Sequence, residues 1–213
     1  MTVTLTVDGK ALQAEAGSNL LEVCLENGIT VPNLCHLPGL EPPPAACRLC
    51  FVELEGIDAP VTSCTVPVSD GMVVHTDTDR VRRLQRSALR FLLSVHDVDC
   101  KNCHANHHCA LQDLARFLKV GLKPRGLSII LKEPEVDDDH PFIRHYPNRC
   151  VLCERCLRTC HDRHGHSPLA LSGRGFDTVI RCFADTPEDA QRCQSCAACV
   201  DVCPVGALVL KTG

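Results

Sequence analysis

The cysteines of this chain stand in groups whose spacing suits metal ligation. Seventeen of the 213 residues are cysteine, and only Cys24 and Cys182 lie outside the groups. The spacing is C-x11-C-x2-C-x13-C in the first group and H-x3-C-x2-C-x5-C in the second, while the third and fourth repeat C-x2-C-x2-C-x3-C. In chain order the groups are Cys35, Cys47, Cys50 and Cys64; His96, Cys100, Cys103 and Cys109; Cys150, Cys153, Cys156 and Cys160; and Cys193, Cys196, Cys199 and Cys203.

The repeated run is the most specific of these signals. In such a run the first three thiolates bind one [4Fe-4S] cluster, and the fourth ligates the other cluster of a two-cluster fold. The predicted ligand sets are Cys150, Cys153 and Cys156 with Cys203, and Cys193, Cys196 and Cys199 with Cys160. A zinc-bound structural scaffold is an alternative because C-x2-C is also half of many zinc sites. A thiol-disulfide oxidoreductase, which needs a single reactive pair, fits the runs less well.

The elements around the first group predict a β-grasp ferredoxin lobe that carries a [2Fe-2S] cluster. Alternating apolar residues over 3–7, the turn pair Asp8-Gly9 and a return strand over 10–15 indicate a hairpin. Asn19 and Glu22 form a candidate capping box for a helix that ends at Gly28. Cys24 shares the apolar face of this helix and is expected to fill the core. Further strands are expected at 51–55 and 71–76.

The second group follows a helix whose inward-facing residues are predicted to be Val81, Leu84, Ala88 and Leu92. Three cysteines leave a cubane one ligand short, and His96 stands just before them, so this residue is either a ligand or a surface histidine. The remaining histidines beside cysteines are expected to face solvent in loops; they are His104, His107, His108, His161, His164 and His166. The proline-rich segment 121–149 reads as a surface connector. Cys182 is expected to be a buried thiol.

The composition agrees with a metal-stabilised protein. Aromatic residues make up 3 % of the chain, there is no Trp, and each third of the chain is too small for a secure apolar core, so we expect removal of iron to unfold the lobes. A net charge of −4 removes the electrostatic basis for general nucleic-acid binding. The sequence shows neither a signal peptide nor a membrane span, which predicts a cytoplasmic protein and disfavours disulfides.

At this point the chain resembles a known family, the iron-sulfur subunit of the diaphorase module in bidirectional NAD(P)-linked [NiFe] hydrogenases. Related to it are the N-terminal part of the complex I large iron-sulfur subunit and parts of NAD-linked formate dehydrogenases. The segments that carry the resemblance are Leu34-Cys-His-Leu, Ala46-Cys-Arg-Leu-Cys, Gly71-Met-Val-Val-His-Thr, His96 to Cys109 followed by Ala-Leu-Gln-Asp, and Arg149-Cys-Val-Leu-Cys-Glu-Arg-Cys.

The resemblance implies one [2Fe-2S] and three [4Fe-4S] clusters, with His96 as a ligand. It implies an electron-transfer subunit between a flavin (FMN) NAD(P)H-binding subunit and the small and large [NiFe] hydrogenase subunits, which would carry out catalysis. The same relay in a formate dehydrogenase or a complex I-like oxidoreductase is the alternative. The end of the chain at Gly213, before any further domain, favours the hydrogenase. No complete G-x-G-x-x-G motif or P-loop indicates a nucleotide site in this chain.

The expected fold class is α+β, with three lobes in chain order. The [2Fe-2S] lobe spans 1–78 and a small helical, histidine-ligated [4Fe-4S] lobe spans 79–120. After a connector over 121–145, a bacterial ferredoxin-like lobe with two [4Fe-4S] clusters spans 146–213.

Overall fold

The computed structural model describes residues 1–183 and 187–211, apart from the side chains of 187–190. The chain divides into two compact units, Met1–Arg90 and Phe91–Gly213. Each unit is described by itself below.

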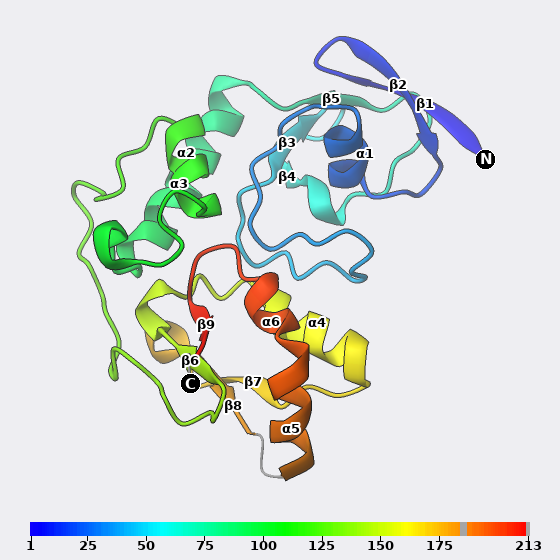
Figure 1. Cartoon of the computed structure of the whole chain (residues 1–213). Helices are drawn as coiled ribbons and strands as arrows, with labels where there is room; N and C mark the ends of the chain where they lie inside the picture. Colours follow the sequence, from blue (N-terminus) through cyan, green and yellow to red (C-terminus); the bar gives the residue numbers. More distant parts are fainter. Residues whose placement is uncertain (184–186, 212–213) are drawn as a thin grey trace. The chain divides into compact units, whose positions relative to one another are not determined.

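Unit 1 begins with the predicted hairpin (Figure 1). Strand β1 (Thr2–Val7) pairs antiparallel with β2 (Lys10–Glu15) along its whole length. Asp8 and Gly9 between them have φ angles of 49° and 80°. Positive φ at both central residues is what a two-residue turn matched to the strand twist requires, so the Asp-Gly signal is confirmed.

Helix α1 (Leu20–Glu26) begins where the sequence places it. The side chain of Asn19 accepts hydrogen bonds from the backbone N–H groups of Leu21 (3.0 Å) and Glu22 (3.4 Å). The carboxylate of Glu22 does not complete a capping box. It accepts a hydrogen bond from the backbone N–H of Gly39 (3.3 Å) instead. Glu22 therefore ties the helix to the loop that follows it.

The sheet of unit 1 is mixed and has five strands in the order β2-β1-β5-β3-β4. Strand β1 pairs parallel with β5 (Val73–His75), and β3 (Phe51–Leu54) pairs antiparallel with both β5 and β4 (Val61–Thr62). Residues of α1 and of the strands share one hydrophobic core, in which Cys24 is fully buried. The placement of Cys24 as core filling is thus confirmed.

Residues 27–50, between α1 and β3, form neither helix nor strand (Figure 1). Three of the four cysteines of the first group lie in or at the end of this long loop. Cys64 lies in the short 3-10 helix Ser63–Thr65. Backbone hydrogen bonds tie the two segments together, since the N–H and the hydroxyl of Ser63 both donate to the carbonyl of Cys50 (2.9 and 3.0 Å).

Helix α2 (Asp79–Ser94) starts in unit 1, and the face that it buries there differs from the predicted one. Val81, Gln85 and Leu89 are fully buried, whereas Leu84 and Ala88 are only half-buried. The amide of Gln85 donates to the carbonyl of Phe51 (3.0 Å) and accepts from Arg82 (2.9 Å). A polar side chain can be buried when its hydrogen bonds are satisfied, which apolar periodicity alone does not reveal.

Unit 2 carries the other three cysteine groups on short elements. Helix α3 (Ala110–Phe117) begins directly after Cys109, and its Leu111 is buried. Two short antiparallel pairs follow, β6 with β9 and β7 with β8. The other elements are the 3-10 helices Cys100–Asn102, Pro147–Arg149 and Gly175–Asp177, the helices α4 (Arg155–His164), α5 (Pro187–Cys196) and α6 (Ala198–Asp201), and the strands β6 (Ile143–His145), β7 (Leu169–Ser172), β8 (Val179–Cys182) and β9 (Leu208–Leu210).

The segment predicted as a connector ends in regular structure. Strand β6 (Ile143–His145) pairs with β9, close to the C-terminus of the described chain. Asp137 and His145 also exchange two backbone hydrogen bonds, at 2.8 and 2.9 Å. A strand of three residues is too short to show a period of two, so no sequence pattern predicts it.

Candidate metal centres

The first cysteine group is buried and tightly coupled. Cys35, Cys47, Cys50 and Cys64 are each at most 3 % exposed. The Sγ atoms of Cys35 and Cys47 lie 3.4 Å apart, and Cys35 donates a hydrogen bond to Cys47. The hydrogen bond from Cys35 lowers the pKa of Cys47 to about 7, and the hydrogen bond from Cys64 lowers the pKa of Cys50 to about 7.

The other two thiols of this group respond in the opposite direction. Hydrogen bonding to Cys47 raises the pKa of Cys35, and hydrogen bonding to Cys50 raises the pKa of Cys64. Two thiolates are thus held near neutral pH by two protonated neighbours in a buried site. A cationic di-iron centre would replace those protons, and this donor set fits the predicted [2Fe-2S] cluster.

The second group lines one cavity of unit 2. His96, Cys100, Cys103 and Cys109 all contribute to its wall, together with Arg149 from the segment before the third group. Burial lowers the pKa of His96 to about 4, so the imidazole is neutral, which is the form that ligates metal. Its Nδ1 atom is buried and has no hydrogen-bond partner among the described residues.

The thiols of the second group face the same space. Burial raises the pKa of Cys109, and negative charge on Cys103 and Cys100 raises it further. An orphaned imidazole nitrogen beside three thiols is a donor set that a [4Fe-4S] cluster with one histidine ligand would satisfy. The residues present therefore fit the implied cluster.

The thiols of the third and fourth groups influence one another. Burial raises the pKa of Cys156, and the negative charges of Cys150, Cys153, Cys203 and Cys199 raise it further. Burial likewise raises the pKa of Cys150 to about 12, with the charges of Cys153 and Cys203 adding to the effect. Cys203 of the second run thus acts on two thiols of the first run, and the crossed ligand sets stay a prediction.

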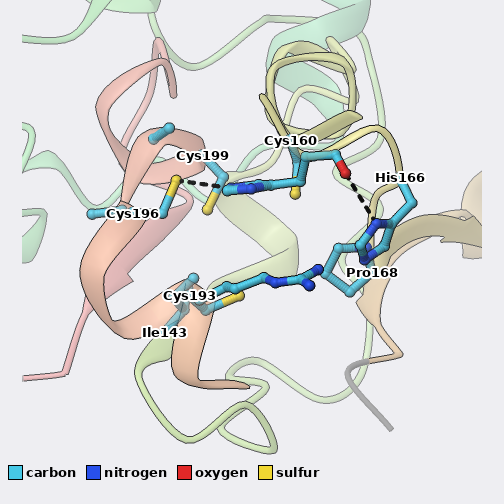
Figure 2. Close-up of a pocket in the computed structure, with 11 residues that line it drawn as sticks. Ile143, Cys160, His166, Pro168, Cys193, Cys196 and Cys199 are labelled. Atoms are coloured by element: carbon cyan, nitrogen blue, oxygen red, sulfur yellow. Dashed lines mark hydrogen bonds between the residues drawn. The ribbon is translucent and has the colours of Figure 1, made fainter. Parts of the chain in front are cut away.

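The second predicted set of C-terminal ligands also combines thiols of both runs. Cys160, Cys193, Cys196 and Cys199 line one cavity (Figure 2). Burial raises the pKa of Cys199 to about 12, and the charges of Cys160, Cys193 and Cys196 raise it further. Both sets offer four thiols from two chain segments, which fits two [4Fe-4S] clusters. As the side chains stand, no three His, Cys, Asp or Glu residues in the described parts of the chain converge closely enough to hold a single metal ion.

Two left-handed residues give the runs a common turn. Glu154 and Ala197, each directly after the second cysteine of its run, have φ angles of 61° and 50°. Each precedes a helix, α4 or α6, that carries the third cysteine. The turn therefore reverses the chain between the second and third ligands of each set.

The histidine predictions are confirmed in part. His104, His107, His108, His161 and His166 are exposed, as expected. The prediction for His164 is wrong, because this residue is half-buried at the end of α4 and its Nε2 atom lies 3.3 Å from Sγ of Cys196. The available signal was the i, i+4 spacing from Cys160, which puts both side chains on one face of a helix.

Cys182 lies at the end of β8 and lines a further cavity together with Asp137, His140, His145 and Cys199. It is half-buried, so its prediction as a buried thiol holds only in part. No helix in the described residues is long and apolar enough to cross a membrane.

Three family models match separate parts of the chain. Residues 1–79 match a 2Fe-2S iron-sulfur cluster binding domain, and residues 85–122 match the NADH-ubiquinone oxidoreductase-G iron-sulfur binding region. Residues 140–209 match the ferredoxin-like domain of NADH-quinone oxidoreductase subunit 3. The matched regions include all four ligand groups.

Curated relatives match almost the whole chain. It is 35 % identical over 209 residues to NADPH-Fe(3+) oxidoreductase subunit alpha of Geobacter sulfurreducens. It is 36 % identical over 217 residues to the mitochondrial NADH-ubiquinone oxidoreductase 78 kDa subunit of Neurospora crassa. Both alignments cover 98 % of this chain, which spans only 24 % and 28 % of the length of those relatives.

A solved structure has the same fold over nearly the same length. A chain in the crystal structure of NAD+-reducing [NiFe]-hydrogenase in the H2-reduced state matches with a TM-score of 0.86 and 27 % identity. The match covers 99 % of this chain and 88 % of that chain.

The fold, the grouped thiols and these matches define an iron-sulfur protein with 2Fe-2S and 4Fe-4S domains of the kind found in NADH-linked oxidoreductases. Within that class, the resemblance predicted from the sequence is confirmed. The chain resembles the iron-sulfur subunit of NAD(P)-linked [NiFe] hydrogenases and is related to the N-terminal part of the complex I large iron-sulfur subunit.

Proposed function

We propose that this chain relays single electrons through one [2Fe-2S] and three [4Fe-4S] clusters between a flavin NAD(P)H-oxidising subunit and a [NiFe] hydrogenase module. When bound, the clusters supply one-electron carriers, and the chain holds them at fixed positions. The ligands are the four groups named above, with His96 completing the second.

The observation that carries this proposal is the crossed grouping of the C-terminal thiols. The charge of Cys203 acts on Cys156 of the first run, and Cys160 lines one cavity with three thiols of the second run. A zinc scaffold has no need for this exchange, whereas a two-cluster ferredoxin fold requires it. The observation therefore favours adjacent clusters over separate structural metals.

The backbone of unit 2 connects the candidate centres directly. The N–H of Ala110, next to Cys109, donates to the carbonyl of Pro204, next to Cys203 (2.9 Å). A second bond of 2.7 Å joins the N–H of Asp97 to the carbonyl of Asn148. These short hydrogen-bonded paths run between the His96 centre and the Cys150 centre, and they support electron exchange between those two.

The candidate ligands of unit 2 are largely shielded from water, and one of them, His96, is neutral. Cys150, Cys153 and Cys156 are each at most 7 % exposed, and His96 is neutral. Burial makes a negative cluster costly, so one imidazole in place of a thiolate favours the reduced state of the His96 centre. The chain thus offers centres of different electron affinity, as a relay needs.

Anaerobic co-purification from the native source tests the proposal. We expect a flavin subunit and the two [NiFe] hydrogenase subunits to be identified by mass spectrometry, with NAD(P)H bleaching the visible absorbance of this chain. We expect about 14 iron atoms and as many sulfides per chain if all four clusters form. A colourless protein with about four zinc atoms would contradict the relay and support the scaffold.

The complex I-like alternative has support of its own. The curated relatives include the 78 kDa and G subunits of NADH-ubiquinone and NADH-quinone oxidoreductases. Recovery of quinone-reducing partners, or of a molybdenum or tungsten subunit as in a formate dehydrogenase, would keep the cluster assignments and change the terminal enzyme.

A further inference from the structure

Two side chains outside the ligand groups reach one sulfur of the C-terminal site. Nε2 of His164 lies 3.3 Å from Sγ of Cys196, and Nη1 of Arg163 lies 3.8 Å from the same atom. Cys196 belongs to the set completed by Cys160, Cys193 and Cys199. Neither His164 nor Arg163 is needed to complete any ligand set.

The end of helix α4 positions these two residues. Cys160 and His164 are four residues apart on this helix and line the same cavity. Gly165 follows with a φ of 73°, and its N–H closes the helix on the carbonyl of His161 (2.7 Å). The ring Nδ1 of His166 donates to the carbonyl of His164 (3.2 Å), which further fixes the last turn.

The direction of the hydrogen bond at Cys196 follows from the chemistry of a thiolate that is bound to iron. A thiolate bound to iron carries no proton and only accepts, so the imidazole must donate its Nε2–H. A neutral imidazole with the proton on Nε2 is sufficient, and no protonation change is needed. Arg163 can only donate and adds a positive charge.

At the companion set a hydrogen bond to sulfur comes from the backbone. The N–H of Leu152 donates to Sγ of Cys150 (3.4 Å). The positive charge of Lys132 also acts on Cys150.

Hydrogen bonds to sulfur and nearby positive charge both stabilise the more negative, reduced state of a cluster. On the basis of the proposed function, we infer that His164 and Arg163 raise the reduction potential of the cluster held by Cys160, Cys193, Cys196 and Cys199. His164 is a positioning residue that acts through Cys196.

The test is a redox titration of the anaerobically purified complex, followed by electron paramagnetic resonance. His164→Leu removes the donor, His164→Gln keeps an N–H at similar reach, and His161→Leu is the matched control on the exposed side of the same helix. We expect His164→Leu to lower the reduced-to-oxidised ratio of this cluster about tenfold, which is about 59 mV for one electron. His164→Gln should recover most of that loss, and His161→Leu should leave the midpoint unchanged.

An unchanged midpoint in His164→Leu at full iron content would overturn the inference. So would an equal fall in His164→Gln, because that would show a packing effect rather than a lost donor. If His164→Leu does not keep this cluster, Arg163→Gln decides, since a midpoint that does not fall there overturns the inference. A wild-type complex without a cluster at this set would overturn the proposed function as well, and iron and sulfide content separate that result from a shifted midpoint.

Discussion

The two C-x2-C-x2-C-x3-C runs have the same spacing and different surroundings. In the first run Cys150 and Cys153 lie in a loop and are buried, whereas in the second Cys193 and Cys196 lie on helix α5 and are half-buried. Only the third cysteine of each run is in the same setting, at or near the start of a helix. Spacing thus determines which thiols are grouped, and the neighbouring elements determine how exposed they are.

The difference in surroundings implies a difference in chemistry. A buried set should be slow to exchange iron and hard to reduce, because burial disfavours the added negative charge. A half-exposed set with a histidine and an arginine at one sulfur should be easier to reduce and easier to strip. The predictions below separate these two sites, from the largest expected effect to the smallest.

Removal of iron should have the largest effect. Each predicted ligand set of unit 2 joins separate chain segments that are built on short elements, so unit 2 should lose its cooperative unfolding transition when a chelator removes all iron. Unit 1, whose sheet and α1 share a continuous core, should keep more of its structure. Circular dichroism and calorimetry of iron-free protein check this, and a retained cooperative transition for unit 2 would contradict it.

Stepwise chelation sharpens the comparison. Iron should leave the half-exposed Cys193 set before the buried Cys150 set. The order in which the two paramagnetic signals disappear measures this. If the signals disappear in the reverse order, exposure of the thiols does not control the access of the chelator to the iron.

Acid should weaken unit 2 through His145, which lines the cavity that includes Cys199. Both ring nitrogens of His145 are buried without partners among the described residues, and burial lowers its pKa from 6.5 to about 4. The unfolded state therefore binds more protons between these values, and stability falls as the pH drops from about 6.5 towards 4. The expected loss is about 2 kcal/mol between pH 7 and pH 5.

Hydrogen exchange at the β6 and β9 amides measures this effect in the iron-loaded protein. His145→Leu should flatten the pH dependence by about that amount. An equally steep dependence in the variant would assign the acid sensitivity to other groups.

His96→Cys extends the comparison to the second group. The substitution converts that centre into a third set of four thiols and adds a negative charge. The reduced-to-oxidised ratio of its cluster should therefore fall at least tenfold, which lowers the midpoint potential by about 59 mV. The midpoints of the two C-terminal sites serve as internal controls. An unchanged or raised midpoint at full iron content would count against the charge argument.

The smallest effect concerns the turn that the two runs share. Glu154→Gly and Ala197→Gly relieve a left-handed residue but give the unfolded chain more freedom. The two effects nearly cancel. We expect the free energy of unfolding of each variant, measured by chemical denaturation, to rise by about 0.5 kcal/mol. A loss of more than about 1 kcal/mol in only one variant would mean that the runs do not use the turn alike.

The sequence was informative where spacing or period acts over several residues. It predicted the Asp8-Gly9 hairpin and the cap at Asn19, because each depends on local chemistry. The crossed thiol sets, which depend on two distant segments, stay a prediction. It did not predict strand β6, whose three residues are too few for a period. For α2 it predicted the burial of Val81 correctly but not that of Gln85. The burial of Gln85 depends on a partner, the carbonyl of Phe51, far away in the sequence.

The role of His164 was missed for a related reason. A run of polar residues and histidines at 161–166 resembles a solvated loop. The helix that presents His164 to Cys196 is held by the fold of unit 2, and Cys196 lies 32 residues further along the chain. Contacts of this kind follow from tertiary structure, and no local pattern specifies them.

The central claim is that the chain holds four clusters and that the two C-terminal clusters have crossed ligands. Iron content and paramagnetic signals of the variants Cys203→Ser and Cys160→Ser test it most directly. Cys182→Ser is the control outside the ligand groups. The account predicts that Cys203→Ser loses about four iron atoms and the signal of the Cys150 set, while Cys160→Ser loses those of the Cys193 set. Cys182→Ser should keep all of its iron. Loss of the signal that belongs to the mutated residue's own run would contradict the crossed arrangement.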